Sequence, residues 1–210
     1  MGLMLKELEY SRENFGVDPF GYSAQAFYQF GVVKALHGIP VNFDAAPTSE
    51  DLKNPILWLA HAEALTQAAI TLIKTEPKFE NMPFEIRAIC DSQYCAVTLM
   101  LIGYSLEISL KSMMIMSHGI SGYIEIEKKH RHHRLHELSQ FIPTLNRKEK
   151  AILRLLTHFV YWAGRYPDPG SGREDDATEI FELSETYRIT GSDLLRLSAK
   201  VMQYTKQVVG

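Results

Sequence analysis

The sequence has only two cysteines among its 210 residues, Cys90 and Cys95. Both lie in an apolar stretch with helical spacing, where residues five apart point in different directions. A disulfide or a shared metal ion is therefore not expected for this pair. The pattern favours two buried thiols in a reducing compartment.

The sequence also lacks a strong charge of either sign. Its net charge is −3, and hydrophobic residues make up 46% of the chain, with an isoelectric point of about 6.2. This balance argues against a uniformly basic nucleic-acid-binding protein and leaves room for a local basic patch. The apolar content is enough for a substantial core.

No uncharged apolar run is long enough to predict a membrane span. The most apolar stretch, Cys95 to Met116, contains Glu107 and Lys111, which a spanning helix tolerates poorly near its centre. The first six residues, Met1 to Lys6, show no basic segment followed by an apolar run, so no signal peptide is expected. We predict a cytoplasmic protein without a membrane partner.

Helical spacing of apolar residues dominates the chain. It predicts helices over residues 23–37, with Ser23 as the cap, 55–76, 84–117, 132–142, 146–164, 176–188 and 192–208, with Ser192 as the last cap. The long helix is expected either to be two helices or to kink near Gly103, and Gly119 and Gly122 are expected to end it. Residues 119–131 are expected to form a loop, in which 123–127 alternates as a short strand would.

Because almost no strand is predicted, the fold class is an all-α helical bundle. The segment 38–53 is rich in proline, asparagine and aspartate, which is typical of a loop. We therefore predict an N-terminal helical segment with its loop over residues 1–53 and a main bundle over residues 54–210. One single compact unit is the alternative.

Three short motifs follow one another in the second half of the chain. Glu107 and Lys111 form a Glu-x-x-x-Lys pair on the long helix, His133-Arg134-Leu135-His136-Glu137-Leu138 opens a short helix, and Arg165-Tyr166-Pro167 ends the amphipathic helix. In this order they resemble the HEPN family of helical bundles, over roughly residues 90–208. The resemblance implies an up-and-down helical core, an association with nucleotides or RNA, and a homodimer. Residues 1–85 are not covered by it.

Active ribonucleases of that family carry an arginine followed, after four to six residues, by a histidine. If Arg165 matches this arginine, positions 170–172 should hold the histidine, but they are Gly170, Ser171 and Gly172. The resemblance therefore implies a binding or regulatory protein without the usual ribonuclease pair. It also implies a nucleotidyltransferase or antitoxin as partner, as in toxin–antitoxin and defence systems.

The densest cluster of basic residues lies at 128–136. A phosphate or RNA contact is one interpretation of it, and the candidate ligand-binding residues are Lys128, Lys129, Arg131, His132, His133, Arg134 and Arg165. A solvated start of a helix is the plainer interpretation. A metal site at His132 and His136 is the weakest, because no further ligand completes it. Neither a metal nor a cofactor is predicted.

Arg131 and His136 have four residues between them, so they offer an alternative ribonuclease pair, with Arg165 as a third candidate catalytic residue. Histidine titrates near neutral pH and arginine can bind phosphate with two hydrogen bonds, which is the chemistry that RNA cleavage needs. The spacing also arises by chance in so basic a segment. Catalysis thus stays an alternative to binding, and a protein-interaction bundle is the third hypothesis. Glu107 and Lys111 are interpreted as a structural ion pair.

Overall fold

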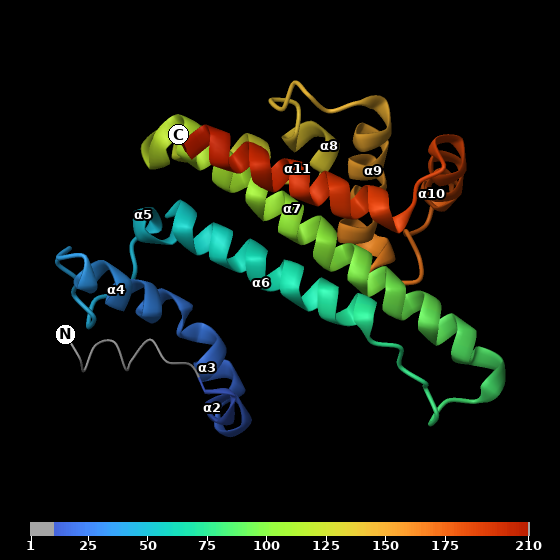
Figure 1. Cartoon of the computed structure of the whole chain (residues 1–210), viewed down its shortest axis with the longest axis horizontal. Coiled ribbons are helices and arrows are strands. Elements are labelled where there is room, and N and C mark those ends of the chain that lie inside the picture. The colour runs from blue at the N-terminus through green and yellow to red at the C-terminus, as the bar shows by residue number, and fades with distance from the viewer. Residues whose placement is uncertain (1–10, 210) are drawn as a thin grey trace. The chain divides into compact units, whose positions relative to one another are not determined.

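The computed structural model describes residues 11–209, with side chains up to Thr205, and this part of the chain is all-α. Figure 1 shows the helices in chain order. They are α2 Arg12–Val17, α3 Pro19–Ala24, α4 Ala26–Leu36, α5 Ser49–Leu52, α6 Pro55–Lys74, η1 Phe84–Ile86, α7 Arg87–Ile126, η2 Glu127–His130, α8 Leu135–Leu138, α9 Arg147–His158, η3 Phe159–Ala163, α10 Glu174–Tyr187 and α11 Gly191–Val209. The expectation of no signal peptide concerns Met1 to Lys6, which lie outside the described residues.

The chain divides into two compact units, residues 1–57 and residues 58–210. The division falls in the first turn of α6, close to the predicted end of the N-terminal segment at residue 53. The Asn54 side chain accepts a hydrogen bond from the Ile56 backbone N–H (3.0 Å), and Pro55 opens α6, as Asn-Pro at a helix start predicts.

The N-terminal unit holds α2 to α5. The predicted helix over 23–37 is wrong at its start, because Ser23 lies inside α3 and its hydroxyl donates to the Pro19 carbonyl (2.7 Å). The segment predicted as loop contains α5, since Thr48 and Asp51 form a capping box. Lys34 on α4 pairs with Asp51 (3.1 Å). The Thr48 hydrogen bonds, and after them Lys34, lower the pKa of Asp51 to about 2.

The 58–210 unit is built around α7, which supplies more of the core than any other helix. Its backbone leaves helical geometry at Gly119 (φ 70°, ψ 166°) and not at Gly103, so the predicted kink is misplaced. A positive φ is easily reached only by glycine. Gly103 has another role: a Cβ there would lie 2.4 Å from Val160 Cγ2, so its missing side chain lets η3 approach α7.

Beyond Gly119 the chain becomes helical again, as the end of α7 and then as η2. The predicted loop over 119–131 and the alternating strand at 123–127 are therefore wrong. Tyr123 is buried and packs edge-on against Trp58 (6.2 Å between ring centroids), so the alternation reflects one buried face of a helical turn. The predicted helix over 132–142 shrinks to the four residues of α8.

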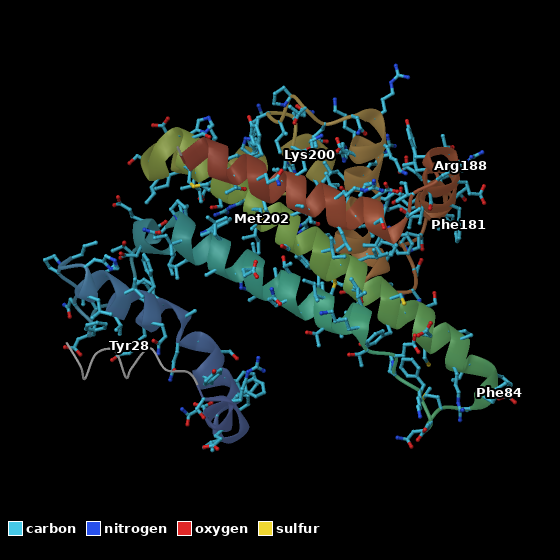
Figure 2. All side chains as sticks on the ribbon, in the orientation of Figure 1. Tyr28, Phe84, Phe181, Arg188, Lys200 and Met202 are labelled. Carbon is cyan, nitrogen blue, oxygen red and sulfur yellow. The ribbon has the colours of Figure 1, made fainter. Side chains whose placement is uncertain are left out.

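The last three α-helices complete this unit. The predicted capping box at Asn146 and Glu149 is confirmed, with bonds of 2.9 and 2.7 Å. Ser192 is not the cap of α11, because the helix already begins at Gly191. Helix α11 packs along α7 (Figure 1). Figure 2 labels Lys200 and Met202 on α11, and Lys200 reaches across to the Glu149 carboxylate (2.7 Å).

The structure also bears on the predictions about the cysteines and about membrane-spanning helices. Cys90 and Cys95 are both free, but Cys90 is only partly buried and Cys95 is exposed, so the prediction of two buried thiols is wrong. The segments Ser49–Lys74 and Phe84–His130 have the length and apolar composition of membrane-crossing helices; the apolar window of the second is 56% buried and that of the first 11%. Burial of the second is typical of a core helix.

Candidate functional site

Basic and imidazole side chains from three parts of the 58–210 unit meet around one open cavity of about 560 Å³. We call it the cationic pocket. Its lining comes from the segment before and into α8, from α9 and η3, and from the start and middle of α10: His132, Arg134, His136, Arg154, Thr157, His158, Tyr161, Arg173 and Glu179. The lining holds three arginines and three histidines against one carboxylate.

The α9 side of the pocket follows from helical spacing. Arg154, His158 and Tyr161 are four and three residues apart, so they share one face. The opposite, apolar face packs into the core through Ile152, Leu156 and Val160. This arrangement leaves the Arg154 side chain 55% exposed while His158 is only 10% exposed at its side chain.

Glu179 on α10 holds the α9 side in place. Its carboxylate forms an ion pair with Arg154 and accepts a hydrogen bond from His158 Nε2 (2.7 Å). Because one carboxylate binds two side chains one turn apart, both lose rotamer freedom on folding and not on ligand binding. The pocket wall is therefore preorganised.

The opposite wall is held by a buried carboxylate on α7. Glu107 is 5% exposed, and it pairs with Lys111 (2.7 Å) and with His133 Nδ1 (2.9 Å). Lys111 also donates to the His132 carbonyl (3.2 Å). The Glu-x-x-x-Lys pair thus ties the backbone of the histidine-rich segment to the core helix, and this fixes the direction in which His132 and Arg134 leave that segment.

Two pocket histidines, His132 and His136, have a pKa below the usual value for histidine. Burial is the main cause at both, and the positive charge of Arg134 adds to it; Glu137 opposes the shift. At His136, Arg154 contributes in the same direction as Arg134. The Nδ1 atom of His136 is buried and has no hydrogen-bond partner within the described residues. Both rings are therefore neutral at pH 7, and protonation below pH 6.5 would add positive charge to the pocket.

Three of the residues predicted to bind or react lie on the pocket: His132, Arg134 and His136. The others do not line it. Arg131 pairs with Glu127 (3.0 Å), and Lys128 and Lys129 lie on η2. His133 points to Glu107, and Arg165 bonds to the Tyr161 carbonyl and lies over the Tyr166 ring. Arg131 and His136, the alternative catalytic pair, are thus not brought to one pocket.

Sequence reasoning missed four polar residues of the site, Arg154, His158, Arg173 and Glu179. A signal was present for two of them, since Arg154 and His158 stand one helical turn apart on the most amphipathic helix. Glu179 lies on a different helix, and no local pattern connects it with α9. Within residues 11–209 no group of three or more histidine, cysteine or acidic side chains could hold a metal ion.

The geometry suits an anion with several oxygen atoms. Arginines held in place by carboxylates can donate paired hydrogen bonds to phosphate, and neutral histidines can donate one each. No protein-family model, no curated protein and no solved structure matches this chain.

Proposed function

We propose that the protein is a HEPN-like module that binds a nucleotide or RNA through the phosphate group, using the cationic pocket. The observation that carries the proposal is the set of three arginines, Arg134, Arg154 and Arg173, around one cavity. Each is paired with a carboxylate on or beside the wall, Glu137, Glu179 and Asp176 respectively. Such pairs hold the guanidinium groups in position for a ligand.

Binding without cleavage is the favoured form of this function. The ribonuclease pair of the HEPN family is incomplete after Arg165, and the alternative arginine, Arg131, pairs with Glu127 outside the pocket. In a regulatory role the module would work beside a nucleotidyltransferase or an antitoxin, as a cytoplasmic homodimer. These partners rest on the HEPN resemblance alone.

One observation favours a second candidate, a metal-independent endoribonuclease. His136 and His158 line the same pocket as the arginines, and a pair of histidines can exchange protons with a ribose hydroxyl and a leaving oxygen. A single-stranded RNA pool incubated with the protein and EDTA separates the two functions. Intact RNA supports the binding module, whereas cleavage that disappears in His136→Ala establishes the enzyme.

The binding function is tested by calorimetric titration of the whole chain with a short single-stranded RNA at several salt concentrations. We expect the affinity to fall as salt rises, because bound phosphates release counterions. Arg134→Ala removes one charged hydrogen-bond donor, which is worth about 1.5–3 kcal/mol, so it should weaken binding roughly 10- to 100-fold.

Arg196→Ala is the matched control. This arginine is also exposed and also paired with an acidic residue on its own helix, but it lies outside the pocket lining. It should bind RNA as the unaltered protein does. Equal loss in both variants would indicate nonspecific attraction, and no binding by the unaltered protein would refute the proposal.

A further inference from the structure

Tyr161 places a half-exposed aromatic ring on the wall of the cationic pocket. It is 46% exposed, although its neighbours Val160 and Trp162 are 0% and 7% exposed. A ring with this exposure gives up nearly half of the free energy that full burial would provide. The ring is nevertheless held at the mouth of a cavity lined by arginines.

Tyr161 lies in an irregular turn of the helix that lines the pocket. Residues 159–163 form a π-helical turn, in which the Gly164 N–H bonds to the Phe159 carbonyl (3.1 Å). Such turns are rare and occur frequently at functional sites.

The ring of Tyr161 already accepts a planar cation. The Arg173 guanidinium lies 5.1 Å from the ring centroid, and His133 contacts the ring edge-on, with the centroids 6.3 Å apart. A nucleobase is planar like a guanidinium and stacks on an aromatic ring in the same way. The cavity of about 560 Å³ is in the range that holds one small-molecule ligand.

We propose that the cationic pocket takes an unpaired nucleobase, which stacks on Tyr161 while its phosphate is bound by the arginines. This inference rests on the proposed function and adds the ligand class to it: a free nucleotide, or an unpaired residue of a single strand, and not the backbone of a duplex. The base replaces Arg173 on the ring, and Arg173 remains close enough to the pocket to contribute to phosphate binding.

The test compares 5′-AMP with ribose 5-phosphate, which carries the same phosphate without a base, by calorimetric titration of the whole chain. Stacking on an aromatic side chain predicts that AMP binds about 5- to 150-fold more tightly. Equal affinity for both ligands overturns the stacking and leaves the phosphate-binding function intact. If neither ligand nor an RNA strand binds, both proposals fail.

Variants locate the base. Tyr161→Leu should remove the preference for AMP over ribose 5-phosphate, and Tyr161→Phe should retain it. Tyr166→Leu is the matched control, because Tyr166 is also exposed, lies under an arginine and is outside the pocket lining; the preference should persist there. If Tyr161→Leu weakens both ligands equally, the ring only supports the pocket wall and the proposal is wrong.

A single-stranded trinucleotide identifies the source of the base. Tighter binding than AMP assigns the pocket to a strand, and affinity equal to that of AMP assigns it to the free nucleotide. Either result supports an unpaired base. A longer, fully paired duplex that contains the same sequence and binds as tightly as the single strand overturns the proposal.

Discussion

Removing the Glu107 carboxylate should destabilise the protein strongly, because this buried group pairs with the buried Lys111 ammonium and also with the partly exposed His133. Glu107 is 5% exposed and lies 2.7 Å from Lys111 and 2.9 Å from His133. The Lys111 side chain is itself only 12% exposed. Glu107→Leu would therefore leave a buried ammonium group with the His132 carbonyl as its remaining hydrogen-bond partner.

The magnitude follows from the cost of an unpaired buried charge. Breaking a buried pair by removing one partner costs about 3–5 kcal/mol, whereas replacing both partners with apolar residues of similar size is often close to neutral. Glu107→Leu and Lys111→Met should each be costly, and the double variant should be less destabilised than the sum of the two by about 1–3 kcal/mol.

Urea unfolding at pH 7, followed by circular dichroism, measures all three variants. Arg131→Ala is the control, since its ion pair with Glu127 is on the surface and the Arg131 side chain is 72% exposed; it should change the free energy of unfolding by less than about 1 kcal/mol. Costs for Glu107→Leu and Lys111→Met that simply add in the double variant would refute the view that the two groups act as one buried pair.

Three further predictions concern packing, the pocket wall and pH. Gly103→Ala should lower the free energy of unfolding by roughly 1–3 kcal/mol in thermal or urea unfolding, because its Cβ would lie 2.4 Å from Val160. Gly191→Ala is the control, because a Cβ at Gly191 has no neighbouring atom within 4 Å and causes no clash. Equal losses of stability in the two variants would contradict this packing. Glu179→Ala should release α10 from α9, at a cost of about 1–3 kcal/mol, and amide exchange should rise in residues 174–187 more than in α11; unchanged exchange there would show that other contacts hold α10. The affinity for a dinucleoside monophosphate, whose charge is constant, should rise as pH falls below 6.5, because His132 and His136 have a lowered pKa and a bound anion favours their charged forms. The rise can reach about tenfold for each unit by which the ligand raises the pKa of a ring. Affinity that is constant from pH 7.5 to 5.5 would show that neither ring faces the ligand.

The helices could be predicted where apolar spacing and end signals coincide. Asn146 with Glu149, and Asn54 before Pro55, marked helix starts that the structure contains. The prediction was wrong where a local signal has two readings. Gly119 looks like a helix end, yet the chain becomes helical again after one residue with positive φ, because Tyr123 gains burial beside Trp58.

The site could be predicted only in part for a related reason. Basic residues close together in sequence, such as Lys128 and Arg134, suggest one patch, but of these two only Arg134 lines the pocket. The pocket instead joins Arg134 to Arg154 and Glu179, which are far apart in the sequence. Their proximity depends on the packing of α8 and α10 against α9, and a pattern read along one helix does not contain it.

The central claim, that the cationic pocket binds a nucleotide phosphate, is tested most directly by NMR of the histidine rings during titration of the unaltered protein with 5′-AMP. We expect the ring signals of His132, His136 and His158 to shift with one shared dissociation constant. His37 and His61, which are exposed outside the pocket, should stay unchanged. Saturating shifts at His37 or His61 with none at the pocket histidines, or no shift at any ring, would contradict it.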